Sequence, residues 1–315
     1  MVSIILIILG FILLIKGADI LVDSSSNIAK KFHIPEIIIG LTIVSMGTSL
    51  PELIVSAKAA TSGFSDMSVG NVLGSNICNL FLILGLASII RPLVFQKETK
   101  LIEIPICLIL TIIFGVLCNT NIGISRLEAV ILICLFIMFI IYTIILGIKG
   151  KHQKEIEEKS ENRNNISILK NFIYIILGII ALKFGGDFVV DNAVNIAEHF
   201  KISEKIISLT IVAIGTSLPE LVTSIVAAIK GNNDISIGNI IGSNIFNMSF
   251  IIGISALIKP ITYNITYNFE IIVLTLASIL LFIFPIIKPK NIMTRKNGII
   301  YVSLYIIYTL ILLTI

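Results

Sequence analysis

Long apolar stretches, separated by short polar connections, run through the whole of this 315-residue chain. A helix needs about 20 consecutive apolar residues to cross the roughly 30 Å hydrocarbon layer of a bilayer. Ten stretches are long enough, near residues 2–23, 36–60, 67–90, 101–119, 126–148, 171–193, 206–229, 234–258, 269–287 and 298–315. Because lipid satisfies no backbone hydrogen bonds, such stretches favour helices. We therefore predict an all-α polytopic membrane protein with ten transmembrane helices.

The composition agrees with this prediction and narrows the partners. Hydrophobic residues make up 56% of the chain and charged residues 13%, so the lipid bilayer is the expected surrounding. The net charge of +4 comes from basic residues spread over short connections, which presents no patch for nucleic acid. Four cysteines lie within or at the ends of apolar stretches, without the paired spacing of a metal site or a disulfide framework.

One half of the chain repeats the other. Residues 17–85 align with residues 185–253 at a constant shift of 168 and without a gap. Five predicted spans, an odd number, separate equivalent points, so the second copy enters the membrane from the opposite side. Such inverted repeats are typical of secondary transporters, whose binding site lies where the halves meet. We predict a first five-helix repeat over 1–148, a linker over 149–170 and a second five-helix repeat over 171–315.

Both repeats carry the hexapeptide Gly-Thr-Ser-Leu-Pro-Glu, at residues 47–52 and 215–220, in the middle of an apolar stretch. A carboxylate near the bilayer centre costs roughly 3 kcal/mol, so Glu52 and Glu220 need a compensating partner. Proline lacks an N–H and displaces the carbonyl four residues before it, which frees backbone oxygens. Carboxylate, hydroxyl and carbonyl oxygens are the ligands that hard cations such as Na⁺ and Ca²⁺ accept. A kinked helix with a glutamate facing water is the alternative.

A second polar motif follows each hexapeptide, in the next apolar span. Gly-Asn-Val-Leu-Gly-Ser-Asn-Ile-Cys-Asn begins at residue 70, and its counterpart begins at residue 238. Glycines four residues apart permit close helix packing, which would explain the glycines alone. They do not explain the polar residues Ser75, Asn76, Asn79, Ser243, Asn244 and Asn247. Residues four apart share one helical face, so an oxygen-lined face is expected to point toward the glutamates.

The basic residues predict the orientation. Sixteen of the 23 Lys and Arg residues lie in one set of connections, four lie in the other set, and three lie within spans. The positive-inside rule assigns the richer set to the cytoplasm. It therefore predicts extracellular N- and C-termini and a cytoplasmic 149–170 linker. The short connections favour a prokaryotic plasma membrane.

The paired motifs, five spans apart, resemble the two alpha-repeats of the sodium/calcium exchangers of the cation/calcium antiporter superfamily, particularly the short prokaryotic members. The corresponding segments here are residues 39–85 and 207–253. The resemblance implies Ca²⁺ and Na⁺ as transported substrates, no cofactor and no enzymatic activity. It implies Glu52 and Glu220 as central ligands of both ions. The other implied ligands are Thr48, Thr216, Ser49, Ser217, Ser75, Ser243, Asn79, Asn247, and the carbonyls of Ser45 and Ala213.

The resemblance also implies exchange by alternating access, with about three Na⁺ per Ca²⁺. The exchange would be electrogenic, because one net positive charge would cross the membrane in each cycle. Some members of the family carry an aspartate at the position of Asn247. An acid there is associated with K⁺ transport in the potassium-dependent branch, so the asparagine favours K⁺ independence. The alternatives are a Ca²⁺/H⁺ antiporter of the same superfamily, an intramembrane hydrolase that uses the glutamate pair, and a channel.

Overall fold

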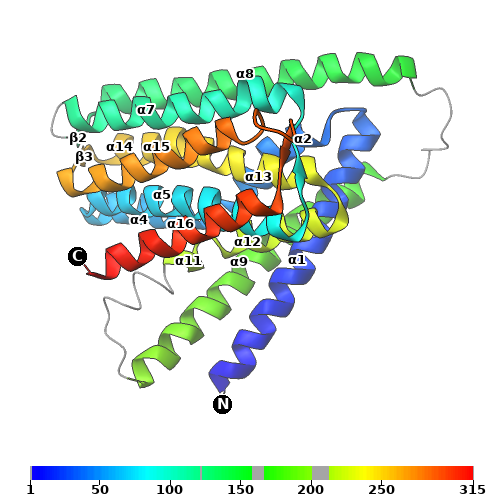
Figure 1. Ribbon diagram of the computed structural model, residues 1–315. Coiled ribbons are helices and arrows are strands. Elements are labelled where there is room, and N and C mark those ends of the chain that lie inside the picture. Colours follow the sequence, from blue (N-terminus) through cyan, green and yellow to red (C-terminus); the bar gives the residue numbers. More distant parts are fainter. Residues whose placement is uncertain (1, 121–122, 158–166, 201–212, 315) are drawn as a thin grey trace.

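The computed structural model describes residues 2–120, 123–157, 167–200 and 213–314, and nearly all of them are helical (Figure 1). The helices of the first half are α1 (Val2–Phe32), α2 (Glu36–Ile39), η1 (Gly40–Val44), α3 (Ser45–Thr48), α4 (Leu50–Ser62), α5 (Ser65–Ile77), η2 (Cys78–Leu84), α6 (Gly85–Ile90), η3 (Thr99–Glu103), α7 (Ile104–Thr120) and α8 (Arg126–Glu157). Those of the second half are α9 (Ile168–His199), α11 (Ala213–Gly215), α12 (Leu218–Lys230), α13 (Asn233–Phe246), η5 (Asn247–Ile251), α14 (Ile252–Ile258), η6 (Ile265–Tyr267), α15 (Asn268–Ile283) and α16 (Arg295–Thr314).

The apolar helices match the predicted spans. Within the described residues, eight helices are long and apolar enough to cross a membrane. A ninth span is formed by Glu36–Thr48 and Leu50–Ser62, which meet at 47°. The predicted span 206–229 begins in residues that the structure does not describe, and α11 and α12 are its described part. The all-helical membrane fold is therefore confirmed.

Two short strand pairs mark the two ends of the helices. Strands β1 (Leu93–Val94) and β4 (Ile292–Met293) pair at one end, and β2 (Gly123–Ile124) and β3 (Ile261–Thr262) pair at the other (Figure 1). Both ladders are antiparallel. Since β1 precedes α7 and β2 follows it, the two ladders lie at opposite ends of a membrane span. The connections that contain β1 and β4, both predicted to be cytoplasmic, thus meet at one end of the molecule. Those that contain β2 and β3, both predicted to be extracellular, meet at the other end.

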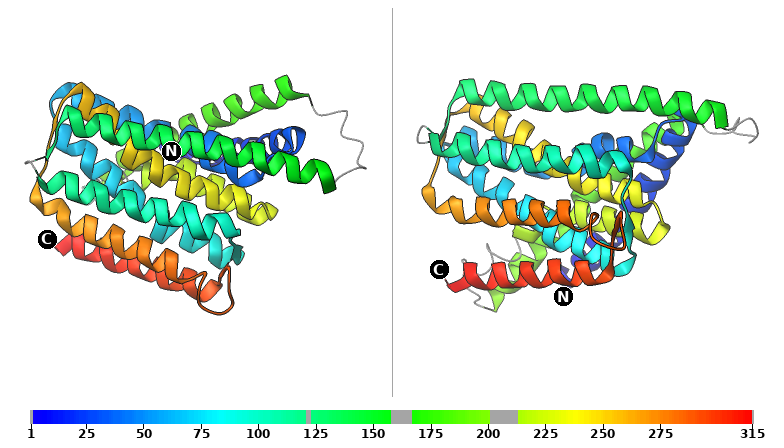
Figure 2. Two further views of the ribbon diagram at one scale, coloured as in Figure 1. Left: turned by 90° about the horizontal axis from the view of Figure 1, so that it is seen from above. Right: turned by 45° about the horizontal axis from the view of Figure 1, so that its top comes forward.

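The spans that carry the repeated motifs form the centre. Buried residues make up 72% and 83% of the apolar windows of spans 67–90 and 233–258, against 17–39% in the other six helices that qualify. Leu73, Ile77 and Ile245 have no exposed surface. Around this centre, α8, α7, α15 and α16 lie in successive rows along one side (Figure 2). The central helices are therefore shielded from lipid by the others.

Helices α1 and α9 form a closely packed antiparallel pair beside the central spans (Figure 1). A Cβ added to Gly10 would lie 2.8 Å from the carbonyl oxygen of Gly185, and one added to Gly17 would lie 2.9 Å from that of Gly178. Gly10 and Gly178 are equivalent positions of the two repeats, as are Gly17 and Gly185. Only glycine permits backbones to approach so closely, so these four residues hold the pair together.

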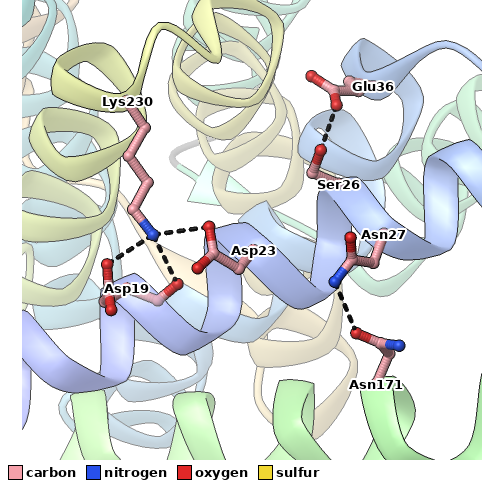
Figure 3. A network of polar contacts seen from close by, with 7 residues as sticks. All are labelled: Asp19, Asp23, Ser26, Asn27, Glu36, Asn171 and Lys230. Carbon is pink, nitrogen blue, oxygen red and sulfur yellow. Dashed lines mark hydrogen bonds and ion pairs between the residues drawn. The ribbon is translucent and has the colours of Figure 1, made fainter. Parts of the chain in front are cut away.

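A polar network joins α1 to its neighbours near the end of α12 (Figure 3). Lys230 Nζ lies 2.5 Å from Asp19 Oδ1 and 2.6 Å from Asp23 Oδ1, which ties α12 to α1. Asn27 Nδ2 donates to Asn171 Oδ1 of α9 at 3.2 Å. The position equivalent to Lys230 in the first repeat is Ser62, so the other repeat has no basic residue there.

Two helices continue beyond the apolar stretches that predicted them. The apolar pattern ends the first span at residue 23 and the sixth at residue 193, whereas α1 continues to Phe32 and α9 to His199. The polar residues Ser24, Ser25 and Ser26 are buried against other helices, so the end of the apolar pattern does not end α1. The predicted linker is also partly helical, because α8 reaches Glu157 and α9 starts at Ile168.

Candidate cation-binding site

Each hexapeptide forms a break between two helices. The backbone leaves the helical region at Ser49 (φ −84°, ψ 12°) and at Ser217 (φ −88°, ψ 7°). Pro51 and Pro219 then occupy the first turn of α4 and α12, where a missing N–H costs nothing. The repeated sequence therefore produces the same break twice, and a new helix begins directly after each break.

Glu52 and Glu220 lie in the first turn of these two helices and are almost completely buried, with 0% and 1% exposure. The N-terminus of a helix favours a negative charge. The serines bind crosswise: Ser49 Oγ donates to Glu220 Oε1 at 2.7 Å, and Ser217 Oγ lies 3.5 Å from Glu52 Oε1. Ser75 Oγ of α5 also donates to Glu52 Oε1, at 3.4 Å. Each carboxylate is thus held by the opposite repeat, and the two repeats build one site.

Four buried oxygens in this region have no hydrogen-bond partner among the described residues. They are Glu52 Oε2, Glu220 Oε2, Asn79 Oδ1 and Asn247 Oδ1. They form two pairs related by the repeat. A buried polar atom without a partner costs about 1–3 kcal/mol, and more when it is charged. A cation that contacts these oxygens would remove that cost.

Asn79 and Asn247 lie in π-helical turns, since η2 begins at Cys78 and η5 at Asn247. Such turns are frequent at functional sites because they displace a side chain from the regular helical pattern. Their amide nitrogens are occupied: Asn79 Nδ2 donates to Asn244 Oδ1, and Asn247 Nδ2 donates to Asn76 Oδ1, both at 3.0 Å. Both residues are therefore held with one oxygen free.

The remaining predicted ligands differ between the repeats. Thr48 Oγ1 contacts Asn239 Oδ1 at 3.0 Å and the carbonyl of Ser45 at 3.2 Å. Ser243 Oγ donates to the same carbonyl at 3.4 Å, so the oxygen of Ser45 already accepts two hydroxyls. Thr216 is half-buried and lines a cavity of about 150 Å³. Ala213 begins α11, and its side chain lies outside the described part of the structure.

Six further buried or half-buried residues, which were not predicted, form hydrogen bonds behind the glutamates, on α4 and α12 and on the helices that pack against them. Asn71 Nδ2 donates to the carbonyl of Glu52 at 3.3 Å and to Ser56 Oγ at 2.9 Å. Asn239 Nδ2 makes the equivalent bonds in the second repeat, at 3.4 and 2.9 Å. Ser68 and Ser236 bind the carbonyls of Ser56 and Ser224, both at 2.9 Å. The signal was present, since every one of these residues repeats at the 168-residue shift.

The composition of the site restricts the ion. Among the described residues, no group of three or more His, Cys, Asp or Glu side chains lies close enough together to hold a metal. Only two carboxylates are present, and the other donors are hydroxyl, amide and main-chain oxygens. This oxygen set suits hard cations and lacks the nitrogen and sulfur ligands that transition metals prefer.

The chain matches the family model described as sodium/calcium exchanger protein, over residues 2–145 and 170–314. The chain belongs to this family. The resemblance seen in the motifs is thereby confirmed, and so is the exchanger fold. The two matched segments each contain one copy of the paired motifs, as expected for a family built from repeats.

Two known proteins and one solved structure resemble the chain over most of its length or more. The inner membrane protein YrbG of Escherichia coli is 38% identical over 280 residues, which is 87% of this chain and 86% of YrbG. The sodium/calcium exchanger MaX1 of Methanosarcina acetivorans is 32% identical and covers 99% of this chain and 98% of its own. A solved structure of the sodium-calcium exchanger NCX_Mj superimposes with a TM-score of 0.84 at 34% identity, covering 98% of this chain and 97% of NCX_Mj. The protein is therefore a multi-pass membrane protein of the exchanger family.

Proposed function

We propose that this protein is a secondary antiporter that exchanges Na⁺ for Ca²⁺ across the membrane. The observation that supports this most strongly is the set of four buried oxygens, two from carboxylates and two from amides, that have no hydrogen-bond partner in the described part of the chain. Oxygen ligands of this kind bind Na⁺ and Ca²⁺. MaX1 and NCX_Mj are named as sodium/calcium exchangers, and both proteins align with nearly the whole chain.

The proposed ligands surround the two helix breaks. Glu52 and Glu220 would bind both ions, and the other oxygens would complete the site. These are Thr48, Thr216, Ser49, Ser217, Ser75, Ser243, Asn79, Asn247, and the carbonyls of Ser45 and Ala213. The carbonyl of Ser45 already accepts two hydroxyls, so it would serve only after Thr48 or Ser243 turns away.

The charge of the site explains why it would bind either Ca²⁺ or Na⁺ and not both at once. One Ca²⁺ neutralises Glu52 and Glu220, whereas three Na⁺ leave the same site with one positive charge. With this ratio, a tenfold Na⁺ gradient supplies about 1.4 kcal/mol per ion. The net charge adds about 2.3 kcal/mol at 100 mV. The sum of about 6.5 kcal/mol would sustain a Ca²⁺ gradient of between four and five decades.

Alternating access requires one part of the protein to move against another around the site. The glycine contacts between α1 and α9 would make these two helices move as a unit. We propose a cytoplasmic connection between α8 and α9 and extracellular termini, because the connections at the β1–β4 end are rich in Lys and Arg. The proposed repeat units remain 1–148 and 171–315, and the proposed membrane is the plasma membrane.

The test is ⁴⁵Ca²⁺ uptake by proteoliposomes that contain the purified protein and are loaded with Na⁺. We expect uptake that needs internal Na⁺ and proceeds without K⁺, because Asn247 is not an acid. A membrane potential that is positive inside the vesicles should accelerate uptake, because three Na⁺ would leave for each Ca²⁺ that enters. Empty liposomes and liposomes without a Na⁺ gradient are the controls. Uptake that follows a pH gradient and ignores Na⁺ would show a Ca²⁺/H⁺ antiporter instead. Cleavage of a peptide by the wild-type protein would show a hydrolase.

A further inference from the structure

Four asparagines form a chain of hydrogen bonds across the boundary between the repeats. Asn76 and Asn79 come from the first repeat, and Asn244 and Asn247 from the second; their exposure is 0–1%. Two bonds join side chains to side chains, and two join side chains to main-chain carbonyls. Every bond connects one repeat with the other, so the network has the symmetry of the inverted repeat.

The network determines which way each amide points. Asn76 Nδ2 donates to the carbonyl of Asn244 at 3.2 Å. A main-chain carbonyl only accepts hydrogen bonds, so the nitrogen of Asn76 has to face it. The oxygen of Asn76 then faces Asn247 and accepts its Nδ2 at 3.0 Å. This leaves Asn247 Oδ1 as the atom that faces away from the network, and no described residue forms a hydrogen bond with it.

The same reasoning applies to the other half of the network. Asn244 Nδ2 lies 3.4 Å from the carbonyl of Asn76, and Asn244 Oδ1 accepts from Asn79 Nδ2 at 3.0 Å. Asn79 Oδ1 is therefore the free atom on its side. Both free atoms are oxygens because two main-chain carbonyls fix the two central amides.

We propose that Asn76 and Asn244 are positioning residues that make Asn247 and Asn79 present oxygen to the transported cation. An amide that turns over would present two N–H groups, which repel a cation where an oxygen would bind it. This inference rests on the proposed function, because it assumes that the free oxygens contact an ion. Asn76 and Asn244 themselves would not touch the ion.

The test is a double-mutant cycle between Asn76 and Asn247. An aspartate at 247 carries oxygen on both positions, so its orientation no longer depends on Asn76. We expect Asn76→Ala to weaken Ca²⁺ binding about tenfold when residue 247 is Asn. The Asn247 oxygen would no longer be held toward the cation, and the loss is comparable to that of one hydrogen bond to a charged group. With Asn247→Asp present, the same change should alter binding by less than about twofold, the usual limit for independent sites. Equilibrium ⁴⁵Ca²⁺ binding to the purified protein measures both.

Asn71→Ala is the matched control. It removes the two hydrogen bonds that the Asn71 side chain donates behind Glu52, and neither of them involves Asn76 or Asn247. Its effect should therefore be the same with Asn or Asp at 247. The second cycle, Asn244→Ala with Asn79→Asp, repeats the test if Asn76→Ala fails to fold. Equal losses in both backgrounds, or a double variant that does not regain binding, would overturn the positioning role. A wild-type protein that neither binds Ca²⁺ nor exchanges it for Na⁺ would instead contradict the proposed function.

Discussion

Gly74 and Gly242 occupy equivalent positions in the two repeats, and the residues that the structure describes surround them differently. A Cβ on Gly242 would lie 2.5 Å from Ser45 Oγ, 2.7 Å from the carbonyl oxygen of Leu41 and 2.8 Å from the Cα of Leu41. Among the described residues, nothing lies within 4 Å of a Cβ built on Gly74. Gly242 therefore holds α13 directly against η1 and α3, and we expect Gly242→Ala to be far more damaging than Gly74→Ala.

The size of the effect follows from the contacts. Two of the three atoms belong to the backbone of Leu41, so the added methyl group can be accommodated only if the helices separate. Overpacking of this kind costs about 1–3 kcal/mol. At about 2–4 °C per kcal/mol, the melting temperature Tm should fall by roughly 2–12 °C. Gly74→Ala should leave Tm unchanged or raise it slightly, because alanine stabilises a helix by up to about 1 kcal/mol relative to glycine.

Thermal unfolding can be followed with a thiol-reactive fluorophore, because Cys78, Cys107 and Cys118 are buried and react only when the protein opens. The chain has no tryptophan, so this probe replaces intrinsic fluorescence. Na⁺-driven ⁴⁵Ca²⁺ uptake, measured on the same preparations, should fall in Gly242→Ala and persist in Gly74→Ala. Equal changes in Tm for the two variants would refute the reasoning, because the glycines would then have the same packing role in both repeats.

Two further predictions concern charged residues. Glu52→Gln and Glu220→Gln should each abolish Na⁺-driven ⁴⁵Ca²⁺ uptake, since one carboxylate cannot neutralise Ca²⁺ in a site of low polarity. Glu103→Gln, a change at a buried carboxylate bound by Tyr142, should retain uptake; loss of uptake in all three would contradict a site-specific role. Lys230→Gln should lower Tm at low salt by the effect of at most about 1 kcal/mol, and high salt should remove the difference. The control is Lys183→Gln, which breaks an ion pair within the single helix α9. If Lys230→Gln lowered Tm equally at low and high salt, the ion pairs between α12 and α1 would not be the cause.

The binding site was predicted from motifs that occur in both repeats. The hydropathy pattern alone predicted the membrane spans and did not predict the site. The hexapeptides and the Asn-containing motifs were found because they recur at one shift, and the structure brings the side chains of Glu52, Glu220, Asn79 and Asn247 into the buried region between the repeats. Asn71 and Asn239 recur in the same way, but nothing in the sequence says that they bind the backbone of the glutamates. Hydropathy did not predict the end of α1, because the polar residues Ser24, Ser25 and Ser26 are buried inside the protein.

By itself, the sequence determined the helical membrane fold, the inverted repeat and the oxygen-rich chemistry of the site, because apolar length and internal repetition are properties of the chain alone. Only the tertiary structure decided that Ser49 binds Glu220 and that Asn247 donates to Asn76, since an alignment of repeats shows which residues are equivalent and not which ones meet. It also decided where the symmetry is broken. Thr48 binds Asn239, but among the described residues Thr216 makes no matching bond to Asn71, because a single conformation packs two equivalent halves differently.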